Sequence, residues 1–178
     1  MRNDVKEVLF SEEIIQEKVE ELGKQISNDL QDNNPIVIGV LKGANVFLSD
    51  LIRNIDIPII VDFIAVSSYG LSTESSGVVK INKDLDFSIE GKDIVIVEDI
   101  IDTGLTLKYL LENLRSRNPK SIRICSLLDK PERRKVDIKV DYIGFKIPDE
   151  FIVGYGIDYA EKYRNLPFIA SLKREVYE

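Results

Sequence analysis

Acids, hydroxyls and a glycine lie together in the segment VEDIIDTGLT, residues 97–106. The acids are Glu98, Asp99 and Asp102, and the residues that follow them are Thr103, Gly104 and Thr106. A glycine and hydroxyls at a helix start offer backbone N–H groups and the positive dipole end to a phosphate. The acids would repel that phosphate unless they face sugar hydroxyls and a bound metal. The pattern therefore indicates a sugar phosphate, such as ribose 5-phosphate, held with Mg²⁺.

Other phosphate-binding signatures are missing. The segment lacks the Gly-Lys-Ser/Thr of a Walker A loop and the GxGxxG glycines of a dinucleotide fingerprint. A strand followed by an ordinary capped helix is the plain alternative. The chain has no histidine, which excludes His-ligated zinc and both Ser-His and Cys-His nucleophilic catalysis. Carboxylates, lysines or a bound metal must therefore carry any chemistry.

Composition places the chain among ordinary globular proteins. Its 178 residues suit one domain, and 44% are hydrophobic and 31% charged. No apolar run approaches the length of a membrane span, and the N-terminus lacks a signal-peptide core, so we expect a cytoplasmic protein. The net charge of −7 argues against nucleic acid as the main partner. The single cysteine, Cys125, lies in an apolar run and is expected to be a buried, inert thiol.

Hydrophobic periodicity predicts the elements that position these residues. Ser11 is a candidate N-cap of an amphipathic helix that runs to about Leu30, and further helices are expected after residue 41 and from about Thr103. Apolar runs predict strands at 36–41, 59–66, 78–82, 94–97, 121–128 and 140–145. This alternation of strand and helix predicts an α/β fold with a parallel sheet covered by helices on both faces. Such sheets bind ligands at the carboxyl ends of their strands.

Two acids after a hydrophobic strand, followed by D-T-G-x-T, resemble the ribose-binding motif of type I phosphoribosyltransferases. The resemblance extends from about Pro35 to Leu172, and this part of the chain is similar to the hypoxanthine-guanine branch in particular. It implies a central, mainly parallel sheet flanked by helices, with a small hood subdomain. Residues 1–178 would form a single domain, with a core at about 35–145. The hood would comprise the N-terminal residues and about 146–178.

Three further features resemble the pyrophosphate and lid regions of that family. LKGA, residues 41–44, is similar to the pyrophosphate loop, with Lys42, Gly43 and a candidate cis peptide before Lys42. Arg164 matches an arginine that contacts pyrophosphate, a role that suits its planar bidentate donors. Ser68 and Tyr69 resemble a lid that excludes water from the reactive ribose carbon. Without the resemblance, these residues read as a turn, a surface charge and a solvated linker.

The purine site is also implied by resemblance. Lys130 would hold the 6-oxo group, Phe151 would stack on the base, and backbone groups around Ile152 and Asp158 would read its edge. Asp158 would also reach a second magnesium ion on the pyrophosphate. Taken alone, Phe151 reads as core packing and Lys130 as a solvated charge.

The implied reaction displaces pyrophosphate from phosphoribosyl diphosphate by a ring nitrogen of a 6-oxopurine. Asp102 is the candidate to take the proton of the base, although its role could be mainly electrostatic. Glu98 and Asp99 would hold the ribose hydroxyls and Mg²⁺. The residues expected at the 5′-phosphate are Thr103, Gly104 and Thr106, with backbone groups of Asp102 and Leu105. Some relatives carry lysine or asparagine at the position of Leu105, so it receives no side-chain role.

Two other function classes retain part of this pattern. A regulator or pyrimidine transferase would keep the ribose loop and change the base pocket, and a nucleotide-binding protein would lack turnover. The segment KIPDEFIVGYGIDY favours a purine pocket, and the presence of Lys42, Tyr69 and Asp102 favours turnover. Relatives form dimers or tetramers, so a homodimer or homotetramer is expected. The preference among hypoxanthine, guanine and xanthine stays open.

Overall fold

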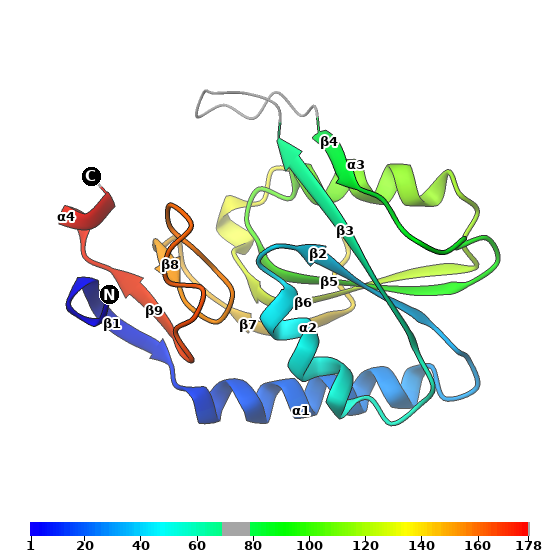
Figure 1. The fold of residues 1–178 in the computed structure, drawn as a ribbon, viewed down its shortest axis with the longest axis horizontal. Coiled ribbons are helices and arrows are strands. Elements are labelled where there is room, and N and C mark those ends of the chain that lie inside the picture. The colour runs from blue at the N-terminus through cyan, green and yellow to red at the C-terminus, as the bar shows by residue number, and fades with distance from the viewer. Residues whose placement is uncertain (69–78, 178) are drawn as a thin grey trace.

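A six-stranded sheet forms the centre of the molecule in the computed structural model, which describes residues 1–68 and 79–177 (Figure 1). The strand order is β4-β3-β2-β5-β6-β7. All neighbours pair in parallel except β3 and β4. The strands are β2 (Ile36–Leu41), β3 (Ile60–Ser68), β4 (Val79–Lys83), β5 (Asp93–Ile101), β6 (Ser121–Asp129) and β7 (Tyr142–Lys146). The α/β class predicted from the sequence is confirmed.

Helices cover both faces of this sheet, as Figure 1 shows. Helices α1 (Glu12–Asp29) and α2 (Asn45–Leu51) lie on one face, and α3 (Leu105–Arg115) lies on the other. Alternate side chains of β5 point to opposite faces of the sheet. Val95 and Val97 pack with α1 and α2, whereas Ile94 and Ile96 pack with α3. Because successive side chains of a strand point to opposite faces, a continuous apolar run is the expected sequence of a strand covered on both sides.

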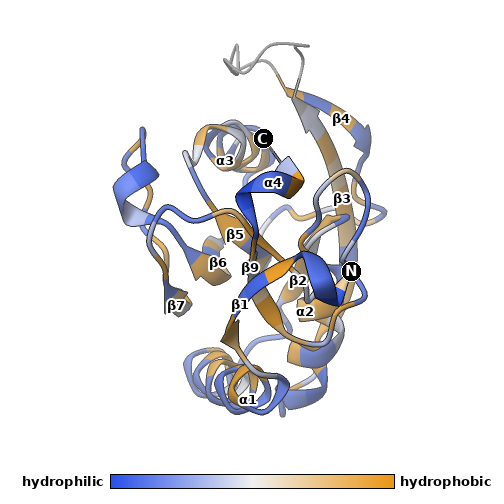
Figure 2. Cartoon of the chain, turned by 90° about the vertical axis from the view of Figure 1, so that its left-hand side faces the viewer, coloured by the Kyte–Doolittle hydropathy of each residue, from blue (hydrophilic) through white to orange (hydrophobic). Residues whose placement is uncertain are grey.

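Helix α1 begins as the sequence predicts. The Ser11 hydroxyl accepts a hydrogen bond from the Ile14 amide, 3.5 Å away, and the helix ends at Asp29. Its fully buried residues recur at helical spacing: Ile15, Val19, Leu22 and Ile26. Figure 2 shows orange hydrophobic residues along the central strands and blue over much of α1 at the edge of the molecule. No helix in the described part of the chain is long and apolar enough to cross a membrane.

A second, smaller sheet joins the two ends of the chain. Its order is β1-β9-β8, with β1 (Val5–Phe10), β8 (Ile152–Val153) and β9 (Ile169–Leu172), and it lies to the left in Figure 1. The short helix α4 (Arg174–Tyr177) follows β9. The division into a core and a hood near residue 146 remains a prediction.

The structure corrects two details of the predicted elements. Strand β5 runs to Ile101 rather than ending at residue 97, so Glu98 and Asp99 lie within it and α3 begins only at Leu105. The expected alternation of strand and helix is wrong between β6 and β7. Among the described residues, that connection contains only the 3-10 helix Pro131–Arg133. Pro131 lacks a backbone N–H and suits the first turn of such a short helix.

Two more 3-10 helices complete the described elements. One, Arg2–Asp4, precedes β1, and the other, Ile52–Asn54, extends α2 by a turn. Cys125 is fully buried in β6, as the sequence predicts.

Candidate active site

The loops that carry the predicted chemistry all leave the same edge of the central sheet. β2, β5 and β6 are parallel, and β5 lies between the other two. Their carboxyl ends, at Leu41, Ile101 and Asp129, therefore lie side by side. Segments far apart in sequence meet at this edge, which is where ligands bind in parallel α/β sheets.

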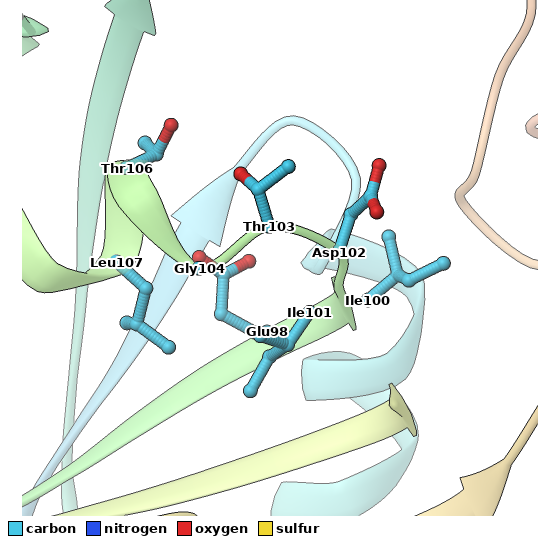
Figure 3. A pocket seen from close by; sticks show the side chains of 8 residues that line it. All are labelled: Glu98, Ile100, Ile101, Asp102, Thr103, Gly104, Thr106 and Leu107. Carbon is cyan, nitrogen blue, oxygen red and sulfur yellow. The ribbon is translucent and has the colours of Figure 1, made fainter. Parts of the chain in front are cut away.

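The first cavity lies where β5 passes into α3, and its volume is about 130 Å³. Its lining residues are Glu98, Ile100, Ile101, Asp102, Thr103, Gly104, Thr106 and Leu107 (Figure 3). Gly104 is the N-cap residue of α3 and has a φ of 79°. A Cβ there would lie 2.9 Å from Val136 Cγ2, so both the backbone angle and the packing require glycine. The cavity thus joins hydroxyls, a helix N-terminus and two carboxylates.

Glu98 and Asp99 point to opposite sides of β5. Glu98 faces the first cavity, and Figure 3 shows its carboxylate near Thr103 and Gly104. Asp99 lies against Gly43, where a Cβ would stand 1.8 Å from Asp99 Oδ2. Burial raises the pKa of Asp99 to about 6. Burial, and next the neighbouring charge of Asp99, raise the pKa of Glu98 well above its ordinary value.

The loop after β2 lies beside Asp99. The peptide between Leu41 and Lys42, a candidate for the cis form, is cis. Gly43 packs closely on a distant turn, because a Cβ on Gly156 would stand 2.1 Å from the Gly43 carbonyl oxygen. Lys42 Nζ lies 2.9 Å from Glu161 Oε2, and both side chains are exposed.

Arg164 belongs to the same cluster. Its Nη1 donates a hydrogen bond of 2.8 Å to the Gly156 carbonyl, and its Nη2 lies 2.8 Å from Asp158 Oδ1. Gly156 in turn packs against Gly43. The four residues expected near pyrophosphate and its metal, which are Lys42, Gly43, Asp158 and Arg164, are therefore brought together with Asp99.

A second cavity, of about 370 Å³, lies beside the first. Its lining residues are Ile100, Asp102, Lys130, Arg133, Asp149, Glu150, Phe151, Ile152, Ile157 and Tyr177. Lys130 is only 8% exposed and its ammonium donates a 2.7 Å hydrogen bond to the Glu150 carbonyl, so it is not a solvated charge. Phe151 is 38% exposed and stacks on Tyr177 with ring centroids 4.5 Å apart, so it is not core packing.

Similarity to known proteins in sequence and in fold shows the family of this chain. A model of the phosphoribosyl transferase domain matches residues 7–160. The hypoxanthine-guanine phosphoribosyltransferase of Bacillus subtilis (strain 168) is 61% identical, and the match covers 100% of this chain and 99% of the relative. This chain belongs to the hypoxanthine-guanine phosphoribosyltransferase family.

Solved structures agree with that assignment. A crystal structure of a hypoxanthine phosphoribosyltransferase from Staphylococcus aureus is 56% identical and superimposes with a TM-score of 0.97, covering 100% of this chain and 97% of that chain. A hypoxanthine-guanine phosphoribosyltransferase from Bacillus anthracis is 57% identical, with a TM-score of 0.91 over 95% of this chain and 99% of that chain. The fold of this family member is therefore that of the solved enzymes.

In this phosphoribosyltransferase, two residues line both cavities: Asp102 and Ile100. Asp102 is the charged one of the two. Both oxygens of the Asp102 carboxylate accept hydrogen bonds from one guanidinium. Arg133 Nε lies 2.9 Å from Oδ1, and Arg133 Nη2 lies 3.4 Å from Oδ2. Asp102 therefore stands between the place expected for the sugar phosphate and the place expected for the base.

The lining residues of the phosphoribosyltransferase site that were not predicted include Ile100, Arg133 and Tyr177. Arg133 follows Lys130 by three positions in the basic run DKPERR, so its sequence neighbourhood was a usable signal. Ile100 is an apolar residue between the acids and carries no chemical signal of its own. Tyr177 is near the C-terminus, and only the fold brings it to Phe151.

Some predicted residues do not join these cavities. The Leu105 side chain lines neither of them, in keeping with the absence of a side-chain role. Ser68 ends β3, whereas Tyr69 lies outside the described residues. Within residues 1–68 and 79–177, no group of three or more acidic or cysteine side chains is arranged to hold a metal. The three predicted ligands Glu98, Asp99 and Asp158 do not form a preformed cage.

Proposed function

We propose that this protein transfers the 5-phosphoribosyl group from phosphoribosyl diphosphate to hypoxanthine or guanine, giving IMP or GMP and pyrophosphate in purine salvage. The observation that carries the proposal is the position of Asp102 in the wall shared by the two cavities. A sugar phosphate in one cavity and a base in the other would meet beside this carboxylate. The family and its named members give the substrates.

The first cavity suits the ribose 5-phosphate. Backbone N–H groups from Thr103 to Thr106 and the dipole of α3 would hold the phosphate. The residues assigned to this sugar phosphate are Glu98, Asp99, Asp102, Thr103, Gly104, Leu105 and Thr106. Leu105 and Asp102 would contribute backbone amides there, and Glu98 with Asp99 would hold the ribose hydroxyls.

The second cavity suits a planar purine. Phe151 would stack on its face, and Lys130 would donate a hydrogen bond to its 6-oxo group. Ile152 and Asp158 would read its edge through backbone groups. Asp102 would take the proton that the base loses when its ring nitrogen attacks the anomeric carbon. The low exposure of Lys130 supports a buried, directed hydrogen bond rather than a surface charge.

Pyrophosphate would leave into the cluster of Lys42, Gly43 and Arg164. Magnesium fits beside it, because Mg²⁺ keeps several waters and binds through one or two carboxylates plus substrate phosphates. Burial and mutual repulsion raise the pKa of Glu98, which a nearby cation would relieve. One Mg²⁺ at Glu98 and Asp99 and a second Mg²⁺ at Asp158 would neutralise the charge of the leaving group. Lys42 and Arg164 would add positive charge to the same place.

Two coarser expectations belong to the same proposal. We expect the enzyme to work in the cytoplasm, because its substrates are soluble metabolites and its composition is that of an ordinary globular protein. We also expect a homodimer or homotetramer. Sedimentation velocity would test the assembly, and a species with the 20.3 kDa mass of one chain would contradict it.

The test is an assay with phosphoribosyl diphosphate, Mg²⁺ and one base at a time. Hypoxanthine, guanine, xanthine, adenine and uracil would be compared by chromatography of the nucleotide product. The proposal predicts IMP from hypoxanthine or GMP from guanine, with an equal amount of pyrophosphate. Product with uracil alone would contradict the proposal and favour a pyrimidine transferase. The absence of product with every base would also contradict it and favour a binding protein.

A further inference from the structure

Arg133 holds the carboxylate at the centre of the site. The guanidinium meets both oxygens of Asp102, at 2.9 and 3.4 Å, and its Nη1 lies 3.4 Å from Asp149 Oδ2. Asp149 Oδ1 in turn lies 3.5 Å from Lys130 Nζ. The candidate base, the arginine and the lysine expected at the purine therefore form one chain of charges around the second cavity.

The backbone that carries Arg133 is fastened to the loop that carries Asp102. The Lys130 amide donates to the Ile101 carbonyl at 3.0 Å, and the Lys135 amide donates to the Thr103 carbonyl at 2.9 Å. These bonds lie on either side of Arg133 in one segment and of Asp102 in the other. The two side chains are therefore set opposite each other by their backbones rather than by a chance meeting of long surface residues.

A planar guanidinium fixes the plane of a carboxylate that it meets with two donors. The geometry points to Arg133 as a positioning residue that orients the Asp102 carboxylate toward the purine. This inference rests on the proposed function. The pairing also raises the pKa of Arg133, chiefly through its hydrogen bond with Asp102.

The test is a double-mutant cycle in the transferase assay. Arg133→Gln is expected to lower kcat with hypoxanthine about tenfold, as for loss of a partly exposed charged hydrogen bond. The KM for phosphoribosyl diphosphate should stay within about twofold, because the phosphate cavity is untouched. Arg133→Lys should recover part of the loss. In the Asp102→Asn background, Arg133→Gln should change kcat by less than about twofold, because coupled residues are not additive.

Lys135→Gln is the matched control, since it removes the same charge from an exposed side chain of the same segment. It should leave kcat unchanged. The inference is overturned if Arg133→Gln has wild-type or higher kcat, if its full effect persists beside Asp102→Asn, or if the control loses as much. Failure of the wild-type protein to form any nucleotide would instead reject the proposed function, so the two failures are distinguishable.

Discussion

Asp102 is the side chain on which both cavities converge. Exchanging it for asparagine removes the proton acceptor but keeps the shape and the backbone amides of the loop. Asp102→Asn should therefore bind phosphoribosyl diphosphate as the wild type does and turn over about 10²-fold more slowly, the usual loss for a general base. Calorimetry and steady-state kinetics would measure the two quantities. Turnover equal to wild type would remove Asp102 from the proton-transfer step.

Gly104 is the second residue on which the site depends. Alanine is disfavoured here for two reasons: the backbone φ is 79°, and a Cβ would lie 2.9 Å from Val136 Cγ2. Gly104→Ala should lower stability by about 1–2 kcal/mol for the left-handed backbone and weaken binding of the sugar phosphate as well. Thermal unfolding and titration with ribose 5-phosphate would show both effects.

Gly91 offers a matched control for that change. Its φ is 67°, and nothing lies within 4 Å of the place of its Cβ. Gly91→Ala should therefore lose stability without losing affinity. Equal loss of affinity in both variants, or none in Gly104→Ala, would show that the close packing at Gly104 has no part in binding.

Helices α1 and α2 are tied to the turn that carries Gly156 through one carboxylate. Asp50 Oδ2 accepts hydrogen bonds from Tyr155 Oη at 2.6 Å and from Gln16 Nε2 at 3.0 Å. Burial by itself would raise the pKa of Asp50, but these bonds and that from Arg53 outweigh burial and lower it. A lowered folded-state pKa stabilises the protein above the unfolded value of about 4, and the contribution is lost as pH falls through the folded value.

Asp50→Asn should therefore be less stable than the wild type at pH 7, by about 1–3 kcal/mol for a charged hydrogen-bond acceptor. The difference should narrow below the unfolded pKa of about 4. Urea unfolding across this range would measure it. Asp32→Asn, which removes an exposed carboxylate, is the control and should show little change at any pH. A difference that grows on acidification would contradict the sign derived from the pKa.

Elements with strong local patterns were predictable from the sequence, and those defined by distant partners were not. The run at residues 36–41 and the capped helix from Ser11 carry their own signals of burial and termination. β1 and β8 lack such signals, because they exist through pairing with β9 near the other end of the chain. In the part of the chain that the structure describes, no α-helix forms between β6 and β7, because residues 130–135 form backbone hydrogen bonds with the loop of Asp102 instead.

The site residues also divide into those with a local sequence signal and those defined by distant partners. The acids and hydroxyls of residues 98–106 are contiguous, so their chemistry could be inferred from type and spacing. Arg133 and Tyr177 act on Asp102 and Phe151 only because the fold brings them there. The purine identity rested on resemblance to a family rather than on the chemistry of Lys130 or Phe151 alone.

The whole molecule closes around the site because its two ends meet. Tyr163 Oη donates to Asp4 Oδ2 at 3.0 Å, and the Lys173 amide donates to the Asp4 carbonyl at 3.0 Å. The small sheet built from both ends thus holds Phe151 and Ile152 over the carboxyl edge of the central sheet. Segments from distant parts of the chain therefore meet at the candidate active site.

We expect turnover to depend on magnesium held by the assembled site. The carboxylates assigned to the metal come from β5 and from the turn at Asp158, and neither part alone offers a complete ligand set. Excess chelator should therefore abolish turnover, and added Mg²⁺ should restore it, while the unfolding temperature of the free protein stays unchanged. Full activity in chelator would exclude the assigned metal role.

We propose that the loop from Glu98 to Thr106 holds the 5-phosphate and ribose while Lys130 and Phe151 hold the base. A crystal structure of the protein with bound IMP tests it most directly. We expect the phosphate on the amides of residues 103–106, the ribose hydroxyls at Glu98 and Asp99, and the purine stacked on Phe151 beside Asp102. A phosphate bound away from the start of α3, or a purine outside the second cavity, would contradict it.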